Sequence, residues 1–175
     1  MMAAARTPSQ QTAQAALMAR LPAVRGRLTP NAPLTKLTWF RTGGPADVLF
    51  EPADIDDLSA LLSQLDPTVP VTVLGLGSNA LVRDGGIEGL VIRLGKPFAR
   101  LSVTGTRLQA GAGASGISTA AAAREASLTG FEYLRGVPGT VGGAVAMNAG
   151  AYGQETGDIL VDAEGVDRAG RRHRL

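Results

Sequence analysis

Two glycine-rich segments hold the residues of this sequence whose types and spacing are suited to chemistry. The first glycine segment, residues 75–80, reads Gly-Leu-Gly-Ser-Asn-Ala and follows the β-rich run 71–74. Glycines let a backbone approach a ligand closely, and successive N–H groups can form a concavity that binds an anion. Ser78 and Asn79 add side-chain donors for phosphate oxygens. The segment is typical either of a phosphate site or of a strand-ending turn that needs positive φ.

The first glycine segment also satisfies the G-x-G-x-x-G/A pattern of Rossmann dinucleotide sites, but its surroundings do not fit that fold. A Rossmann loop opens a helix whose N-terminus faces the pyrophosphate. Here residues 81–83 run into Asp-Gly-Gly at 84–86, which would break a helix within two turns. The acidic residue expected about 20 positions further on is replaced by Leu-Gly-Lys at 94–96. We therefore predict a phosphate-holding turn in a different fold.

The second glycine segment, residues 136–144, has four glycines and a proline in nine residues, and small residues continue to Gly153. Such a segment cannot form a packed core from its own side chains, yet it is too apolar for a solvated linker. A backbone that lies flat against a large planar ligand explains both properties, with Pro138 fixing one φ angle and the glycines clearing space. The alternative is a close crossing of helices or strands that uses small residues for contact.

Composition limits what else the chain could do. It has 175 residues, 45% of them hydrophobic and 18% charged. No run approaches the roughly 20 apolar residues of a membrane helix. It contains no cysteine and a single histidine, His173, which excludes thiolate chemistry and metal sites built from several histidines. We expect a globular protein with no metal site and no membrane segment, whose chemistry belongs to a bound cofactor.

Basic residues gather towards both ends of the chain. No acidic residue precedes Asp47, and four arginines lie within residues 168–174. An acid-free start rich in alanine and arginine is typical of an organelle transit peptide, but we favour a frayed tail with a short helix over residues 12–21. Nucleic-acid binding is not expected, because no aromatic residue lies near the C-terminal arginines to stack on bases.

The elements that must position the two segments follow from the hydrophobic pattern. Strands are predicted at residues 48–50, 71–74 and 90–94, a hairpin at 101–108, and paired strands at 159–166 and 171–175. One helix is predicted to begin after Asp54, its N-cap, and to end before Pro67. An alanine-rich helix is predicted from Ser115 to Leu128, with Gly130 suited to its C-terminal cap. This mixed order favours an α+β fold over a regular alternation.

Three motifs, in order along the chain, resemble those of one enzyme family. They read Trp-Phe-Arg-Thr-Gly-Gly-Pro-Ala at 39–46, Leu-Gly-Leu-Gly-Ser-Asn at 74–79, and the second glycine segment followed by Asn-Ala-Gly-Ala-Tyr-Gly at 148–153. The family is UDP-N-acetylenolpyruvoylglucosamine reductase, also called UDP-N-acetylmuramate dehydrogenase. The resemblance runs over about residues 31–175, and three motifs at family-like spacing are more specific than either glycine segment alone.

The resemblance implies an α+β FAD-binding domain of the p-cresol methylhydroxylase or vanillyl-alcohol oxidase type. Two α+β subdomains, about 31–95 and 96–175, would hold FAD between them, and residues 1–30 would form an N-terminal arm. The first glycine segment would hold the pyrophosphate, and the second would lie along the ribityl chain and isoalloxazine ring. The residues expected to bind FAD are Gly75, Leu76, Gly77, Ser78, Asn79, Ala80, Val137, Pro138, Gly139, Thr140, Gly142, Gly143, Ala144, Asn148 and Gly150.

The resemblance also implies an activity, in which NADPH reduces the flavin and the flavin passes hydride to UDP-N-acetylglucosamine enolpyruvate. The product, UDP-N-acetylmuramate, is used in the cytoplasm for peptidoglycan synthesis. Through this step in cell-wall biogenesis, the family would affect cell shape, the cell cycle and cell division. The family's catalytic arginine, proton-donating serine and late glutamate fall beyond Leu175, as does its substrate-binding domain. No catalytic residue is therefore expected in this chain, which alone is not expected to turn over substrate. The oligomeric state stays open.

Two alternatives to this function remain. Another FAD-dependent oxidoreductase of the same fold, such as an oxidase of small alcohols or sugars, would use similar glycine segments. The covalent flavin attachment common in those oxidases needs a cysteine or a histidine, and only His173 is present. The second alternative is an inactive fragment. If FAD is bound as expected, Gly77→Val should abolish flavin binding without unfolding the chain, because the added atoms would block the phosphate.

Overall fold

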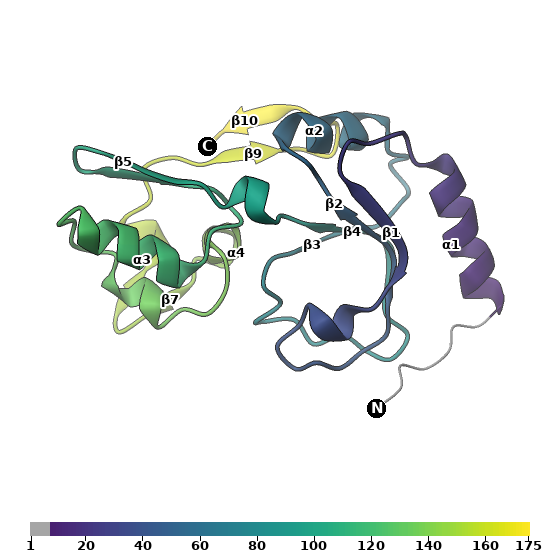
Figure 1. The fold of residues 1–175 in the computed structure, drawn as a ribbon, viewed down its shortest axis with the longest axis horizontal. Helices are drawn as coiled ribbons and strands as arrows, with labels where there is room; N and C mark the ends of the chain where they lie inside the picture. Colours follow the sequence, from purple (N-terminus) through teal and green to yellow (C-terminus); the bar gives the residue numbers. More distant parts are fainter. Residues whose placement is uncertain (1–7) are drawn as a thin grey trace. The chain divides into compact units, whose positions relative to one another are not determined.

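The structure of the chain is a computed structural model that describes residues 8–175. They form two compact units, and the helices and most of the strands are labelled in Figure 1. The first unit comprises the chain up to Arg93 together with Glu164–Leu175, and the second is Leu94–Ala163. The boundary expected near residue 95 assigns everything after it to one subdomain, whereas the last two strands pack with the first unit. Arg172 of the last strand bonds to helix α2 (Ile55–Gln64), and Arg168, in the turn between the two strands, bonds to the loop after that helix.

The first unit is built on a four-stranded mixed sheet in the order β1-β2-β4-β3. β1 (Arg27–Ala32) runs antiparallel to β2 (Ala46–Glu51), while β4 (Ile87–Arg93) runs parallel to both β2 and β3 (Val71–Leu74). The strands predicted at 48–50, 71–74 and 90–94 are confirmed. β1 lies partly within residues 1–30, which the sequence assigns to an N-terminal arm, and it contains Pro30. Because proline disfavours strands, the sequence does not predict this one. Proline is tolerated there because β1 is an edge strand.

The core of the first unit lies around the two central strands. Val48, Leu49 and Phe50 of β2 are all buried, as are Leu90 and Val91 of β4. Because successive strand residues point to opposite faces, consecutive burial means that both faces of the sheet are covered. Helix α2 adds a buried stripe of leucines, and helix α1 (Pro8–Arg20) contacts β1 and β2. The helix predicted over 12–21 is therefore present, and it begins earlier.

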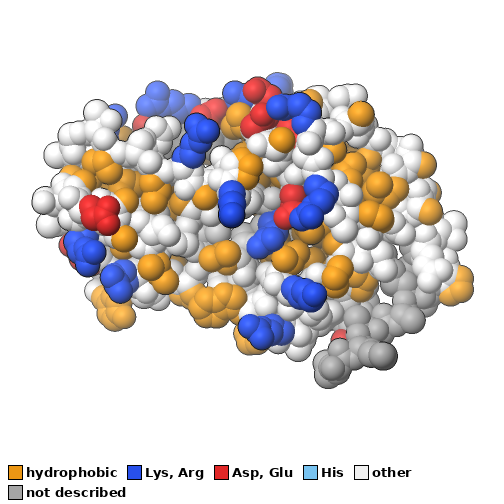
Figure 2. Space-filling view, in the orientation of Figure 1, with side chains coloured by type: hydrophobic (Ala, Val, Ile, Leu, Met, Phe, Trp, Pro, Cys, Tyr) orange, Lys and Arg blue, Asp and Glu red, His pale blue; other side chains and the backbone are white. Residues whose placement is uncertain are grey.

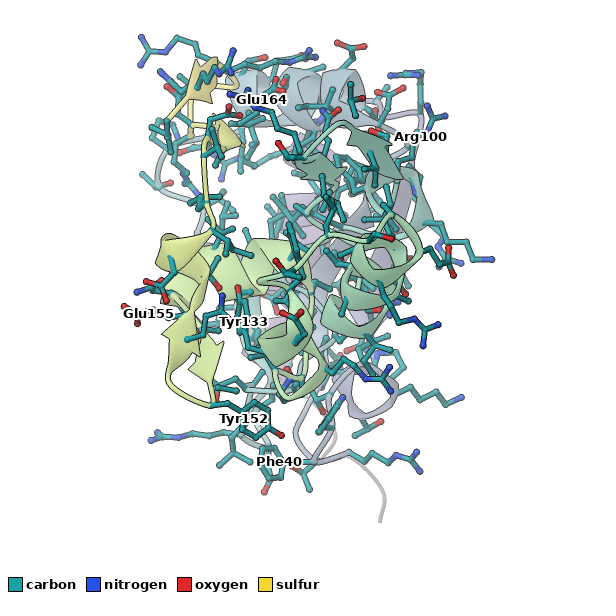
Figure 3. The ribbon with its side chains drawn as sticks, turned by 90° about the vertical axis from the view of Figure 1, so that its left-hand side faces the viewer. Phe40, Arg100, Tyr133, Tyr152, Glu155 and Glu164 are labelled. Atoms are coloured by element: carbon teal, nitrogen blue, oxygen red, sulfur yellow. The ribbon has the colours of Figure 1, made fainter. Side chains whose placement is uncertain are left out.

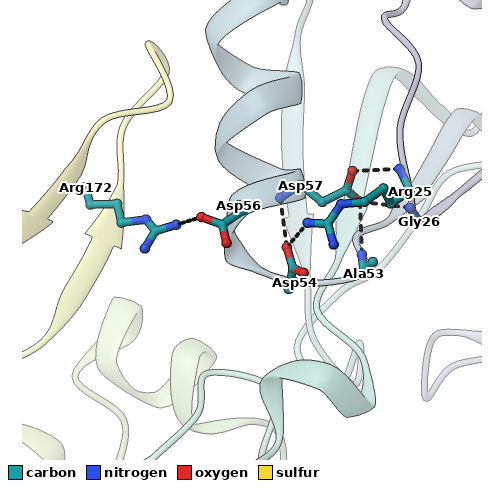
Figure 4. A network of polar contacts seen from close by, with 7 residues as sticks. All are labelled: Arg25, Gly26, Ala53, Asp54, Asp56, Asp57 and Arg172. Atoms are coloured by element: carbon teal, nitrogen blue, oxygen red, sulfur yellow. Dashed lines mark hydrogen bonds and ion pairs between the residues drawn. The ribbon is translucent and has the colours of Figure 1, made fainter.

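Two aspartates fix the N-terminus of α2 (Figure 4). Asp54, the predicted N-cap, accepts a hydrogen bond from the N–H of Asp57 at 2.9 Å and pairs with Arg25. Asp57 itself is 4% exposed. Its carboxylate accepts three backbone N–H bonds, from Arg25 (2.8 Å), Gly26 (2.9 Å) and Ala53 (3.0 Å). Burial alone would raise the pKa of Asp57, but these three donors outweigh it and hold that pKa below its ordinary value.

The C-terminal hairpin packs against the same helix. β9 (Glu164–Val166) and β10 (Arg172–Arg174) pair antiparallel, as the sequence predicts, and Arg172 forms an ion pair with Asp56 of α2. β9 begins later than the predicted residue 159. A 3-10 turn with its own capping box, η4 (Thr156–Asp158), lies directly before that stretch, and the N–H groups of Ile159 and Leu160 bond back to the carbonyl of Thr156 instead of to a neighbouring strand.

Arg168, in the turn of this hairpin, donates to the carbonyl oxygens of Pro67 (3.1 Å) and Val69 (2.7 Å) beyond α2. Arg168→Ala should therefore lower the free energy of unfolding by about 1 kcal/mol, because both carbonyls lose a charged donor. Chemical denaturation followed by circular dichroism measures the change. Arg107→Ala, which removes an exposed arginine of the second unit, is the control and should be nearly neutral. Equal stability of the two variants would contradict the docking role of Arg168.

The second unit contains two helices, two short hairpins and a small core. β5 (Leu101–Thr104) pairs with β6 (Arg107–Ala110), which confirms the predicted hairpin, and β7 (Gly150–Ala151) pairs with β8 (Gln154–Glu155). The helices are α3 (Gly116–Glu125) and α4 (Val141–Met147). The core gathers Ala120, Tyr133, Leu134 and Val137. Further 3-10 turns in the two units are η1 (Leu34–Lys36), η2 (Lys96–Phe98) and η3 (Glu132–Arg135).

Helix α3 begins after Ser115, as predicted, but it ends before residue 128 and is capped without glycine. The N–H of Leu128 bonds to the Ala123 carbonyl at 2.9 Å, and the N–H of Ser127 bonds to the helix at 3.0 Å. These are the two bonds of a Schellman motif, and Ser127 takes its left-handed position with φ 56°. Gly130 is therefore not the predicted cap, and its φ of 92° belongs to the turn before η3.

Candidate functional site

The first glycine segment forms the loop that follows β3. Irregular chain and turns lead from Gly75 to Gly86, and no helix lies between β3 and β4. The sequence-based rejection of a Rossmann site is thereby confirmed, because the pyrophosphate-facing helix of that fold is missing. Gly77 has a φ of 64°, so the loop contains the positive-φ turn that the sequence leaves as one possibility.

This loop is packed against residues 37–45 of the same unit. The N–H of Trp39 donates to the Gly77 carbonyl at 3.2 Å, and the N–H of Gly44 donates to the Arg83 carbonyl at 2.8 Å. A Cβ on Gly77 would overlap the carbonyl oxygen of Leu37. The expectation that Gly77→Val spares the fold is therefore wrong, because the added atoms would meet the protein's own backbone before any phosphate.

The glycines of the motif at 39–46 have the same role. A Cβ on Gly43 would overlap the backbone of Val82, and one on Gly44 would overlap the carbonyl of Asp84. Two motifs that are far apart in the sequence thus form one structural feature, a pair of loops held together by close backbone contact. Glycine is required there because any larger residue would push the loops apart.

A pocket of about 420 Å³ opens beside these loops. Arg93 stands at the end of β4 and has a 3.6 Å ion pair with Glu51, while Arg41 is exposed and has a φ of 52°, unusual for a residue other than glycine. Trp39 is 61% exposed. No carboxylate lines the pocket, so its charge is positive and suits an anion. The lining residues are Lys36, Leu37, Thr38, Trp39, Arg41, Leu76 and Arg93.

Among the residues that line this pocket, only Leu76 is predicted from the sequence to bind FAD, although Trp39 and Arg41 belong to the motif at 39–46. The absence of acidic residues before Asp47 is the signal that could have led to Lys36 and Arg41. Thr42, next to Arg41 in sequence, has a buried Oγ1 that finds no hydrogen-bond partner within residues 8–175. A buried hydroxyl without a partner is costly, which makes this atom a candidate ligand contact.

The second glycine segment is only partly the flat loop that its composition indicates. Residues 136–140 are irregular, but helix α4 begins at Val141, after Thr140 as N-cap. The N–H of Val141 bonds to the Ala114 carbonyl at 2.8 Å, and the N–H of Gly142 bonds to the Ala112 carbonyl at 2.9 Å. These bonds to the chain before α3 stabilise a helix that its two glycines disfavour.

The glycines of this segment differ in what surrounds them. A Cβ on Gly136 would lie 2.6 Å from the ring of Tyr152, and one on Gly142 would lie 2.9 Å from the Cβ of Ala112. At Gly142 the alternative interpretation, close internal packing, is the correct one, whereas the neighbour of the exposed Gly136 is the surface side chain of Tyr152, which is 90% exposed. A Cβ on Gly143 would meet only Thr140 Oγ1, at 3.6 Å, so this exposed glycine leaves space beside α4.

The residues expected to bind FAD fall into two groups. Residues 75–80 lie together in the first unit, and those from 137 to 150 lie together in the second. Within the second group, Val137, Thr140 and Ala144 have buried side chains, so a ligand would meet their main chain. Pro138, Gly139, Gly142, Gly143, Asn148 and Gly150 are at least partly exposed.

Two other kinds of site are not found in the part of the chain that the structure describes. Within residues 8–175, no group of three or more histidine, aspartate or glutamate side chains is placed to hold a metal ion. Over the same residues, no helix has both the length and the apolar character needed to span a bilayer.

Comparison with known proteins shows what the chain is similar to. The model of a family described as FAD binding domain matches residues 46–175. The UDP-N-acetylenolpyruvoylglucosamine reductase of Rhizorhabdus wittichii is 60% identical over 156 residues, which are 89% of this chain and 51% of that protein. The protein of the same name from Parvibaculum lavamentivorans is 56% identical over 163 residues, 93% of this chain and 53% of that protein.

A solved structure agrees with these relatives. The crystal structure of UDP-N-acetylenolpyruvylglucosamine reductase from Thermus caldophilus matches with a TM-score of 0.71 and 35% sequence identity, over 87% of this chain and 53% of that one. The chain thus spans about half the length of the relatives it matches. The resemblance drawn from the three motifs and the predicted FAD-binding α+β fold are both confirmed.

Proposed function

We propose that this chain, which belongs to the FAD binding domain family, is the FAD-binding portion of an NADPH-dependent reductase that converts UDP-N-acetylglucosamine enolpyruvate to UDP-N-acetylmuramate. The observation that carries the proposal is the pocket beside the first glycine segment, where three cationic side chains and an exposed tryptophan lie together. A dinucleotide cofactor joins a pyrophosphate to flat rings. Cations and an aromatic face in one pocket suit both parts of it.

The side chains around the first glycine segment fit a pyrophosphate. Lys36 and Arg41 are exposed, and Arg93 has only a long ion pair, so all three charges are available to an anion. Hydrogen bonds between cationic side chains and phosphate oxygens are about twice as strong as neutral ones. We assign residues 75–80 to the pyrophosphate chiefly through their backbone, and Ser78 and Asn79 form a turn within this segment.

The second glycine segment would contact the rest of the cofactor. Several residues within 137–144 have buried side chains, so the cofactor would contact their main chain, and Gly143 leaves open space for it. Asn148 and Gly150 follow directly after α4. Bound FAD would supply hydride transfer from NADPH to the enolpyruvyl double bond. The part of this chain is to hold and orient that cofactor and to shield it from water.

The proposal extends to the setting of the reaction. We place the reductase in cytoplasmic peptidoglycan synthesis, with a small UDP-sugar as its substrate and with effects on cell shape and division. The substrate-binding domain is assigned to the half of the relatives' length that this chain does not span. We propose no nucleic-acid partner, because no aromatic residue lies near the C-terminal arginines to stack on bases. On the face drawn in Figure 2, basic side chains lie among hydrophobic, neutral and acidic ones.

A visible absorbance titration of the purified chain with FAD tests the proposal. We expect a flavin band that stays with the protein on gel filtration and is released on denaturation. Arg41→Ala should weaken FAD binding about tenfold, because a hydrogen bond to a charged group contributes roughly 1.5–3 kcal/mol. Arg124→Ala, which removes an exposed arginine of α3, is the control and should bind as tightly as the unmodified chain. A folded protein that takes up no FAD would contradict the proposal.

A further inference from the structure

A row of three charged residues crosses one end of the sheet in the first unit and leads into the cationic pocket. Arg27 of β1 lies directly opposite Glu51 of β2. β4 is the next strand, where Arg93 follows Ile92 just as Glu51 follows Phe50, the register partner of Ile92. Of the three charged residues, only Arg93 lines the pocket. One carboxylate therefore joins a surface arginine to a pocket arginine.

The carboxylate of Glu51 is shared unequally between the two arginines. Its Oε2 accepts a hydrogen bond from Arg27 Nε at 2.9 Å and a second one from Arg27 Nη2. Its Oε1 lies 3.6 Å from Nη1 of Arg93, which is too far for a hydrogen bond. Arg27 thus holds the carboxylate, and Arg93 keeps N–H donors that Glu51 does not engage.

The surroundings decide what the loss of Arg27 would do. The side chain of Arg27 is 73% exposed, whereas those of Glu51 and Arg93 are 22% and 30% exposed. A carboxylate released by Arg27 would stay beside Arg93, where solvent screens the two charges less. Arginine and carboxylate pairs frequently form two parallel hydrogen bonds. Released Glu51 would therefore engage the donors of Arg93 and compete with an anion in the pocket.

The pocket is open to such an anion. Leu74 is the register partner of Arg93, so the first glycine segment begins beside this arginine. The loop that contains Trp39 also lines the pocket and reaches the surface, where the neighbouring Phe40 is 59% exposed (Figure 3). A pyrophosphate held by residues 75–80 would thus lie next to Arg93.

We propose that Arg27 and Glu51 are positioning residues, which set the affinity of the pocket for a pyrophosphate group through Arg93. Arg27 keeps Glu51 from closing on Arg93, and Arg93 is thereby left to bind the anion. Glu51 in turn limits how strongly Arg93 attracts the anion, because its negative charge stays 3.6 Å away. The inference deepens the proposed FAD site and rests on it for the identity of the anion.

Arg27→Gln and Glu51→Gln should change the anion affinity in opposite directions. Calorimetric titration with inorganic pyrophosphate measures the pocket alone, and titration with FAD measures the complete site. We expect Arg27→Gln to weaken both affinities about threefold and Glu51→Gln to strengthen both about threefold, the size typical of a partly exposed ion pair. Arg27→Lys keeps the cation and should bind almost as tightly as the unmodified chain. Because a misfolded protein cannot gain affinity, Glu51→Gln stays decisive even if Arg27→Gln is unstable.

The double variant distinguishes this mechanism from a general change of charge. In a chain that already has Glu51→Gln, Arg27→Gln should have no further effect, because no carboxylate remains to be released. The matched controls are Arg20→Gln and Asp66→Asn, which change the same charges in an ion pair of the first unit that does not line the pocket. Both controls should bind pyrophosphate and FAD as the unmodified chain does.

The two titrations also separate this inference from the proposed function. Additive effects of Arg27→Gln and Glu51→Gln, or unchanged affinities in both folded variants, would overturn the inference and leave the FAD site standing. Failure of the unmodified chain to bind FAD would overturn the proposed function, and the pyrophosphate titration would still decide whether Arg27 and Glu51 control the pocket.

Discussion

Replacing Gly77 with alanine is expected to lower the free energy of unfolding by about 3 kcal/mol, and to remove FAD binding with it. The backbone of Gly77 has a φ of 64°, which costs a residue with a Cβ about 1–2 kcal/mol. The new Cβ would also overlap the carbonyl of Leu37, which forces the two loops apart at a further cost of about 1–3 kcal/mol. Chemical denaturation and an FAD titration of the same variant measure the two effects.

Gly85→Ala is the control for this prediction. Gly85 lies in the same stretch between β3 and β4, but a Cβ there would meet nothing within 4 Å, and its φ is not positive. We expect a change within about 0.5 kcal/mol, with FAD affinity retained. If Gly77→Ala proved as stable as Gly85→Ala and lost only the flavin, the glycine would serve the ligand rather than the packing of the loops.

The second large effect is expected at the start of α2. Asp57→Asn should lower the free energy of unfolding at neutral pH by about 2–4 kcal/mol. The carboxylate accepts three backbone N–H bonds, and an amide would turn an NH₂ group towards at least one of those donors. Asp56→Asn is the control in the same helical turn. Its side chain is exposed and makes only an ion pair with Arg172, so its effect should stay below about 1 kcal/mol.

The cost of Asp57→Asn should also depend on pH. The pKa of Asp57 is lower in the folded chain than in the unfolded one, so the folded state binds protons less readily. Its stabilising contribution is then complete above the unfolded value, about 4, and is lost as the pH falls through the folded value. We expect the difference in free energy of unfolding between the unmodified chain and Asp57→Asn to be smaller at pH 3 than at pH 7. A gap that is constant with pH would contradict the ionised role of Asp57.

Local signals explain what the sequence predicts correctly about the fold. Asp54 caps α2 by accepting from the N–H three residues on, and Val71–Leu74 forms a strand from four consecutive β-forming or apolar residues. The C-terminal hairpin follows from its turn residues. The cap and the hairpin join residues within about ten positions of each other, and the strand is indicated by its own residue types, although its partner is the more distant β4. Pattern and propensity are therefore sufficient for these elements.

Contacts between distant residues explain what the sequence could not predict. The role of Gly77 depends on Leu37, which is far away along the chain, and the same holds for the pocket that joins Lys36 to Arg93. Because glycine disfavours helices, the composition of residues 141–147 predicts a loop. The helix forms there because N–H groups of this segment bond to the carbonyls of residues 112 and 114, which the sequence does not reveal. Only the three-dimensional arrangement separates glycines that pack from a glycine that leaves space for a ligand.

The discontinuity of the first unit has a consequence for biosynthesis. Its sheet is complete at Arg93, but the arginines that bond to α2 and its following loop lie after the whole of Leu94–Ala163. A ribosome adds about 5–20 residues per second, so the nascent sheet must wait several seconds for those contacts. During that interval the second unit can form its own hairpins and helices. The part of the protein that is translated first is therefore the part that is finished last.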